Sequence, residues 1–259
     1  MNVIDSFSLK GKTALVTGGA GAYGQQLVQA LAEADAVTYI ASRNLPALEK
    51  VAAEHRQRGH DVRPVKLDQG EEGAILAVRD LIRSERGSLD ILVNNAVARP
   101  VTQGYFDDAS AMEESLRING AGLILVTRTL GEVMADQGSI INIGSMMGLV
   151  GVEPLNYRGT DMSGWYPDYA FHKGGMVNLT RFLASYYGSR GIRCNCIHPG
   201  GLESPNQPAE FVQNYNERTC LGRLATHTDL KGIVVFLASD ASSYITGTNI
   251  PVDGGYTAK

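Results

Sequence analysis

Short apolar runs alternate with longer amphipathic stretches along the whole chain. Glycine or proline lies at many of the boundaries between these segments. Apolar runs that look buried on both faces, as parallel strands are, predict strands at 13–17, 36–41, 62–67, 89–94, 138–144, 192–197 and 248–252. Helical spacing of apolar residues predicts helices at 22–34, 45–58, 71–86, 109–136, 168–189 and 227–239. We find no linker and no short internal repeat. The pattern predicts one α/β domain over residues 1–259, a single-domain Rossmann fold whose doubly wound parallel sheet has about seven strands flanked by helices.

A glycine-rich segment, Gly18-Gly19-Ala20-Gly21-Ala22-Tyr23-Gly24, lies between the first predicted strand and the first predicted helix. Glycines let the backbone approach a pyrophosphate, and a helix N-terminus offers free N–H groups and a favourable dipole. The arrangement therefore predicts dinucleotide binding. A plain glycine loop between a strand and a helix is the alternative.

Tyr169 and Lys173 are four residues apart in a predicted helix, and Ser145 lies upstream at the end of an apolar run. Positions i and i+4 share a helix face, so the lysine ammonium can lie near the phenol. A nearby cation favours the phenolate, and such a tyrosine can act as acid or base near neutral pH. On spacing alone, a tyrosine and a lysine four apart are more often an ordinary amphipathic face.

Taken together, these motifs resemble the short-chain dehydrogenase/reductase family in its single-domain form, over essentially the whole chain. The resemblance includes Thr17-Gly18, Ala22-Tyr23-Gly24, Asp68, Asn94-Asn95-Ala96, Asn119, Ser145, Tyr169, Lys173, Pro199-Gly200, Thr246-Gly247 and Val252-Asp253-Gly254-Gly255. The chain departs from the family at Ala22 and Val97, where glycines are usual, at Tyr23, where an aliphatic residue is usual, and in the long interval between Ser145 and Tyr169.

The resemblance implies a hydride transfer between a nicotinamide cofactor and a substrate carbon. Tyr169 would be the acid or base, and Ser145 would hold the substrate oxygen. Lys173 would support the phenolate and bind the nicotinamide ribose. Asn119 would hold a water in a proton relay, its alternative being a polar residue satisfied inside a helix. The implied cofactor contacts are Gly18, Ala20, Ala22, Tyr23, Gly24, Ser42, Arg43, Asn44, Asp68, Asn95, Ala96, Tyr169, Lys173, Pro199, Gly200 and Leu202.

The end of the second predicted strand bears on the choice of cofactor. An acidic residue there would bind the ribose 2′-OH of NAD, but this chain has Ser42, followed by Arg43. A guanidinium pairs well with phosphate, so the sequence favours NADP(H), with NAD(H) possible and Arg43 as a solvated loop cation. Asp68 is expected to contact the adenine end, or to cap the helix ahead of Glu71.

The segment near 151–167 is an insertion in the interval between Ser145 and Tyr169, and the segment near 199–220 is expected to be a loop over the active site. The insertion carries aromatic rings beside hydrogen-bonding groups, which suits a polyhydroxylated ligand. The candidate substrate contacts are Met146, Tyr157, Arg158 and Trp165. This stretch is similar to family members that act on sugars and sugar acids. The alternative is a surface insertion that packs at a subunit interface. His172 is expected to point away from Tyr169 in a structural or pocket-lining position.

Composition narrows the class of protein further. The chain has 259 residues, 44% hydrophobic and 19% charged, with a net charge of −4, and no basic stripe favours nucleic acid. No signal peptide and no run of about 20 apolar residues is found, so we expect a cytoplasmic protein without a membrane span. Cys194, Cys196 and Cys220 are too few for a disulfide framework and are expected to be packing residues rather than a metal site. The family is often tetrameric, and we expect a homo-oligomer, a tetramer or a dimer.

Three functions remain open. The first is an NAD(P)-dependent oxidoreductase that interconverts a secondary alcohol and a ketone, or a lactol and a lactone, on a sugar, sugar acid or polyol. The second is a 3-oxoacyl thioester reductase acting on an acyl carrier protein. The third is a cofactor-binding sensor without catalysis, which the intact Ser145, Tyr169, Lys173 and Asn119 argue against.

Overall fold

The computed structural model describes residues 2–259. Its centre is a 7-stranded sheet in the order β3-β2-β1-β4-β5-β6-β7, and every neighbouring pair is parallel. The strands are β1 (Thr13–Thr17), β2 (Val37–Ser42), β3 (Val62–Lys66), β4 (Leu89–Asn94), β5 (Met134–Ile143), β6 (Arg193–Pro199) and β7 (Asn249–Val252). The strand order reverses between β1 and β4, and ligands of such sheets bind at that switch point.

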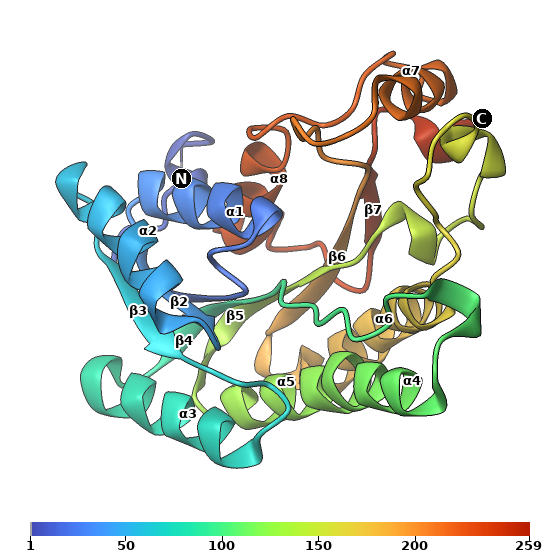
Figure 1. The fold of residues 1–259 in the computed structure, drawn as a ribbon. Coiled ribbons are helices and arrows are strands. Elements are labelled where there is room, and N and C mark those ends of the chain that lie inside the picture. The colour runs from blue at the N-terminus through green and yellow to red at the C-terminus, as the bar shows by residue number, and fades with distance from the viewer. Residues whose placement is uncertain (1) are drawn as a thin grey trace.

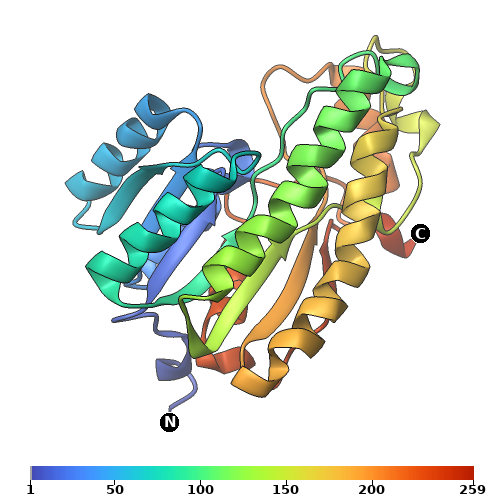
Figure 2. The same ribbon diagram turned by 90° about the horizontal axis from the view of Figure 1, so that it is seen from below.

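Helices cover both faces of the sheet. They are α1 (Ala22–Glu33), α2 (Leu45–Gln57), α3 (Glu72–Arg86), α4 (Ala109–Leu116), α5 (Leu123–Gly131), α6 (Pro167–Tyr187), α7 (Ala209–Arg218) and α8 (Lys231–Ala238). Figure 1 shows α1, α2 and α8 on one face and α3, α5 and α6 on the other. Seen from below in Figure 2, α3, the α4–α5 stretch and α6 lie side by side across the sheet.

Alternation along the strands explains the two cores. Ala14 and Val16 of β1 pack in one cluster with residues of α1, α2 and α8. Leu15 faces the opposite way and packs with residues of α3, α5 and α6. Apolar side chains on both faces of β1 therefore hold one helical layer on each side. The single-domain Rossmann architecture predicted from the sequence is confirmed.

The predicted helix 109–136 extends five residues too far. It is interrupted by the π-helical segment Arg117–Gly122, resumes as α5 and ends at Gly131. Strand β5 begins at Met134, because Leu89 at the start of β4 donates its N–H to the Val133 carbonyl and pairs with Met134. A long-range strand pairing therefore ends the helical pattern there.

The predicted loop 199–220 contains a helix, α7, over Ala209–Arg218. Phe211 and Tyr215, four residues apart, bury their rings against Met146 and Tyr256. This contact packs α7 over the carboxyl ends of β5 and β7. The helix predicted at 227–239 is α8 and begins later, at Lys231.

Candidate active site

A cavity of about 220 Å³ opens where β1, β2, β3 and β4 end. Six of the predicted cofactor contacts line it, namely Gly18, Ser42, Arg43, Asn44, Asp68 and Ala96. The prediction missed its other lining residues, Thr17, Ala41, Leu67, Gln69, Val97, Ala98 and Ile118. Most of these residues are next to predicted residues in the sequence, at the ends of the strands. The predicted strand ends could therefore have identified them.

The glycine loop leaves no room for side chains at two points. Gly18 has a φ of +70°, which favours glycine, and its N–H donates to the Ala41 carbonyl at 2.7 Å. A Cβ at Gly24 would lie 2.1 Å from the Gly18 carbonyl oxygen, so α1 can approach the loop only with glycine there. Ala22 opens the helix and is exposed, which explains why this position accepts a side chain. Such a cradle fits the pyrophosphate of a dinucleotide.

Asn95 joins the ends of β1 and β4. Its Nδ2 donates to the carbonyls of Thr17 and Gly18 at 2.9 and 3.1 Å, and the Thr17 hydroxyl accepts the N–H groups of Asn95 and Ala96 at 3.0 Å. The side chain of Asn95 thus holds the glycine loop in place, while Ala96 faces the cavity.

At the end of β2, the cavity is lined by a free cation. Asn44 caps α2 by accepting the Ala47 N–H at 3.1 Å, and Ser42 lies beside it. Arg43 is exposed and makes no hydrogen bond or ion pair with any residue from 2 to 259. Asp68 accepts the Gly70 N–H at 2.9 Å, in a turn before α3. It is not the N-cap of that helix, which is Glu71, so the capping alternative for Asp68 is wrong.

The predicted catalytic residues Tyr169 and Lys173 lie near the carboxyl end of β5, which Ser145 follows. Lys173 of α6 is buried, donates to the Ile143 carbonyl at 2.6 Å, and lies 5.8 Å from the centroid of the Tyr169 ring. Burial lowers the pKa of Lys173 to about 8, and the charge of Arg99 acts in the same direction. Ser145 follows β5, and its Oγ accepts the Met147 N–H at 3.1 Å. That bond leaves the Ser145 hydroxyl proton available for another acceptor.

His198 holds the backbone at Ser145 in position. It is fully buried on β6, and its Nδ1 lies 2.8 Å from the Ser145 carbonyl oxygen. Its Nε2 lies 2.8 Å from Oδ1 of Asn249 on β7. The ring therefore fixes the backbone of Ser145 to the neighbouring strands.

Asn119 occupies the π-helical segment, a feature often found at functional sites. Its Oδ1 accepts the Ala98 N–H at 2.8 Å, and its Nδ2 donates to the Ala98 carbonyl at 2.9 Å and to Ser115 Oγ at 3.1 Å. Ser115 in turn donates to the buried carboxylate of Asp168, next to Tyr169. The asparagine thus links the loop after β4 to the start of α6.

His172 packs against Tyr169, contrary to the expectation that it points away. The two ring centroids are 5.2 Å apart and the rings meet edge to face, because residues three apart on a helix are neighbours. The His172 side chain is buried, and neither ring nitrogen has a partner within residues 2–259. Burial, helped by the nearby Lys173 charge, lowers the pKa of His172 to about 4.

Arg99 is a site residue that sequence reasoning missed. Its Cζ lies 3.7 Å from the centroid of the Tyr169 ring, a cation–π contact with the predicted acid/base residue. Its position three residues after Ala96, in the loop after β4, was the only available signal.

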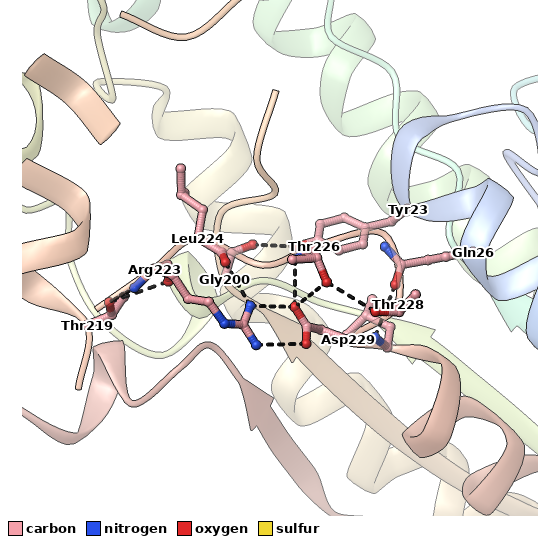
Figure 3. A network of polar contacts seen from close by, with 10 residues as sticks. Tyr23, Gln26, Gly200, Thr219, Arg223, Leu224, Thr226, Thr228 and Asp229 are labelled. Atoms are coloured by element: carbon pink, nitrogen blue, oxygen red, sulfur yellow. Dashed lines mark hydrogen bonds and ion pairs between the residues drawn. The ribbon is translucent and has the colours of Figure 1, made fainter. Parts of the chain in front are cut away.

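The loop after β6 is tied to the glycine loop. The Tyr23 hydroxyl donates to the Gly200 carbonyl at 2.8 Å, which gives this departure from the family pattern a structural role. Leu202 forms an isolated parallel bridge with Ala225. Figure 3 shows the polar network that follows, in which Arg223 holds Asp229 through both carboxylate oxygens, at 2.7 and 3.0 Å.

The same network surrounds a smaller cavity beside Gly200. Thr226 donates its N–H and hydroxyl to Asp229, and the Arg223 hydrogen bond holds the pKa of that carboxyl well below its usual range. The cavity, of about 100 Å³, is lined among others by Gly200, Arg223 and Asp253. These contacts fasten the loop at the carboxyl end of β6, where Pro199 ends the strand.

The four candidate substrate residues do not share one cavity. Met146 is buried and accepts the Tyr215 hydroxyl at its Sδ, at 3.2 Å, and the Tyr157 ring packs against Phe211. Arg158 lines a cavity of about 260 Å³ with Glu217 and Arg218. Trp165 lines a separate cavity of about 440 Å³ with Tyr105 and Phe106. Neither cavity includes Ser145, Tyr169 or Lys173 in its lining.

The cysteines and the helices can be compared with what the sequence predicts about disulfides, metal sites and membrane spans. Cys194 and Cys196 are buried on β6 and unpaired, and burial raises the pKa of both thiols. Across residues 2–259, no group of three or more His, Cys, Asp or Glu side chains could hold a metal ion. No helix in this part of the chain is long and apolar enough to cross a membrane.

Comparison with known proteins assigns the family. A family model described as "Enoyl-(Acyl carrier protein) reductase" matches residues 19–257. The chain is 34% identical to cis-4-hydroxycyclohexanecarboxylate dehydrogenase of Sinomonas cyclohexanicum, over 95% of this chain and 97% of that protein.

Two solved structures are similar over 100% of both chains. One is a short-chain type dehydrogenase/reductase from Mycobacterium marinum, at 30% identity and a TM-score of 0.88. The other is a gluconate 5-dehydrogenase from Burkholderia cenocepacia in complex with NADP and tartrate, at 29% identity and a TM-score of 0.87. With its fold and sequence shared along the full length of such relatives, the chain belongs to the short-chain dehydrogenase/reductase family, as an oxidoreductase acting on alcohol and ketone groups with a nicotinamide cofactor.

Proposed function

We propose that the protein is an NADP(H)-preferring oxidoreductase that interconverts a secondary alcohol and a ketone on a sugar, sugar acid or related polyol. The observation that carries the cofactor preference is the cavity at the end of β2. Ser42 stands where an acid would bind the ribose of NAD, and the neighbouring Arg43 is free to pair with a 2′-phosphate. The similar gluconate 5-dehydrogenase was solved with NADP, and another relative is a dehydrogenase of cis-4-hydroxycyclohexanecarboxylate, which supports the substrate class.

The chain's own residues divide the work as follows. Gly18, Ser42, Arg43, Asp68 and Ala96 would hold the dinucleotide along the strand ends. The bound nicotinamide supplies or accepts the hydride at the substrate carbon.

Proton handling is the task of the residues around Tyr169. In reduction the Tyr169 phenol gives its proton to the substrate oxygen as the hydride reaches the carbon, and in oxidation it takes that proton back. Ser145 donates a hydrogen bond from its free hydroxyl to the same oxygen and stabilises the negative charge that develops there. Lys173 supplies a nearby positive charge, held in place by the Ile143 carbonyl.

We also propose a domain organisation, a location and an oligomeric state. Residues 1–259 act as one catalytic domain with a substrate-loop insertion near 151–167, in the cytoplasm, as a dimer or tetramer. The exposed aromatic side chains of α6 support self-association. Metal ions have no part in the proposed reaction.

A 3-oxoacyl thioester reductase is the second candidate, because a 3-oxoacyl-[acyl-carrier-protein] reductase of Pseudomonas aeruginosa is 31% identical to this chain over 96% of its length. Both candidates use the same proton chemistry at Tyr169. They differ in substrate and are separated by assay.

The test is a screen of sugars, sugar acids, polyols and 3-oxoacyl thioesters with NADP(H) and with NAD(H), following nicotinamide absorbance. We expect turnover of a hydroxylated acid or sugar, a preference for NADP(H), and a shift toward NAD(H) in Ser42→Asp worth about 1–3 kcal/mol. The Tyr169→Phe variant serves as the control and should bind cofactor but lose turnover by orders of magnitude. A wild-type enzyme that prefers NAD(H), or turns over only thioesters, would contradict the proposal.

A further inference from the structure

Arg99 places a cation directly on the residue that handles the proton. Its guanidinium carbon lies 3.7 Å from the Tyr169 ring centroid, closer than the Lys173 ammonium at 5.8 Å. Arg99 is exposed, and its charge adds to the effect of burial in lowering the pKa values of Lys173 and His172. Any substrate oxygen that reaches the Tyr169 phenol therefore approaches this guanidinium.

The backbone on both sides of Arg99 is fixed. The side-chain amide of Asn119 clamps Ala98, accepting its N–H and donating to its carbonyl. Pro100 restricts the backbone of Arg99 itself, and Val101 is buried. Farther along the loop, the Asp107 carboxylate accepts the N–H groups of residues 102 and 103. The arginine is thus held on a braced loop, as a binding residue needs to be.

The guanidinium of Arg99 is nevertheless free. Within residues 2–259 it makes no hydrogen bond and no ion pair, unlike Arg223, which holds Asp229 through two bonds. The nearest carboxylate in the catalytic helix, Asp168, is buried and already bonded to Ser115. The face of the Tyr169 ring that Arg99 covers therefore carries positive charge that no carboxylate within residues 2–259 neutralises.

We propose that Arg99 binds the carboxylate of the substrate and selects hydroxy acids, or the corresponding keto acids, over uncharged alcohols. A planar guanidinium pairs with a carboxylate through two parallel hydrogen bonds while its face rests on an aromatic ring. One small molecule then spans two fixed points, the carboxylate at Arg99 and the reacting oxygen at Tyr169 and Ser145. This inference rests on the proposed oxidoreductase function and narrows it to acids.

The activity test compares acids with their uncharged amides. D-Gluconate and 4-hydroxycyclohexanecarboxylate are each assayed against the matching carboxamide with NADP⁺, in the wild type, Arg99→Leu and Arg99→Lys. We expect Arg99→Leu to lower kcat/KM for the acids by about 10- to 100-fold and to leave the amides within about 3-fold. Arg99→Lys should fall between, since it keeps the charge but loses the planar fork. Arg181→Leu, an exposed and equally unpaired arginine on α6, is the matched control and should change neither.

A binding test keeps the inference separate from catalysis. Calorimetry measures the binding of cyclohexanecarboxylate and its amide, which have no reacting hydroxyl, to each protein saturated with NADP⁺. We expect the wild type to bind the acid at least ten times more tightly than the amide, and Arg99→Leu to lose that difference. Equal losses for acid and amide, an unchanged acid affinity in Arg99→Leu, no acid binding in the wild type, or a comparable loss of NADP⁺ affinity would overturn the inference. If no alcohol is oxidised by the wild type, the proposed function fails, and the calorimetric comparison still decides the role of Arg99.

Discussion

At the scale of single residues, the site is set by which polar groups are satisfied and which are left free. Lys173 is satisfied by the Ile143 carbonyl, whereas Arg43 and Arg99 have no partner within residues 2–259. The two free arginines lie in different places. Arg43 lines the cavity at the ends of β1, β2, β3 and β4, and Arg99 lies on the Tyr169 ring. Anionic groups of two ligands would compensate them separately.

His172 makes the stability of the protein depend on pH. An unfolded histidine titrates near ~6.5, while burial lowers the pKa of His172 to about 4. Between these values the unfolded chain binds the proton and the folded chain does not, so stability is lost as the pH falls from about 6.5 toward 4. At pH 5 the titration of His172 lowers the free energy of unfolding by on the order of 2 kcal/mol relative to neutral pH.

We therefore expect His172→Leu to flatten the pH dependence of unfolding. Leucine is similar in size and removes two buried nitrogens that lack partners within residues 2–259, so stability at pH 7 should be equal or slightly higher. Denaturant unfolding of wild type and variant from pH 4.5 to 8 measures the difference between their free energies of unfolding. The contribution of the carboxylates, which both proteins share, cancels in that difference. Parallel curves over that range would show that the His172 ring does not titrate as described.

At the scale of elements, the sequence predicted well where the pattern reports local burial. Strand β1 was predicted with its observed bounds, Thr13–Thr17, because every residue in it is buried. Contacts between distant segments could not be predicted. Val133 and Met134 continue a helical pattern, but the contacts of Leu89 with both residues end it, and Met134 begins strand β5.

The same limit applies to the candidate site. Tyr169 and Lys173 were predicted from their four-residue spacing in a helix together with the family resemblance, and Ser145 from its place at a strand end and the same resemblance. Arg99 was missed because its contact with Tyr169 joins residues 70 positions apart, and no local pattern records it. Helix α7 was missed because its pattern rests on only two buried rings, Phe211 and Tyr215, in a glycine- and proline-rich neighbourhood.

The start of α1 yields a prediction about backbone packing. Alanine usually stabilises a helix relative to glycine by about 1 kcal/mol, but a Cβ at Gly24 would meet the Gly18 carbonyl at 2.1 Å. We expect Gly24→Ala to lower stability by about 1–3 kcal/mol and to weaken NADP(H) binding, because helix and loop must separate. Gly175→Ala on α6, where a Cβ meets nothing within 4 Å, is the control and should raise stability slightly. Thermal unfolding with and without NADPH measures both effects, and equal behaviour of the two variants would contradict the packing argument.

At the scale of the whole molecule, exposed aromatic side chains gather on the catalytic helix. Phe171, Phe182 and Tyr186 of α6 are 72%, 60% and 67% exposed, and the rings of Phe182 and Tyr186 stack. Figure 2 shows α6 beside the α4–α5 stretch on the outer surface of the sheet. A helix that covers a sheet face on one side needs no aromatic row on the other, which is why we predict self-association through this surface.

The prediction is that Phe182→Ser with Tyr186→Ser weakens assembly while leaving the fold intact. A closed dimer buries the same patch on both protomers, so each substitution removes two buried side chains from the interface. Each buried aromatic side chain contributes roughly 1.5–3 kcal/mol to the free energy of association. The loss should move a dimer or tetramer toward monomer at micromolar concentration in light scattering. Tyr244→Ser is the matched control, since Tyr244 is 102% exposed and lies outside α6. A monomeric wild type would refute self-association, and an unchanged oligomer in the double variant would place the interface elsewhere, with the insertion at 151–167 as the next surface to test.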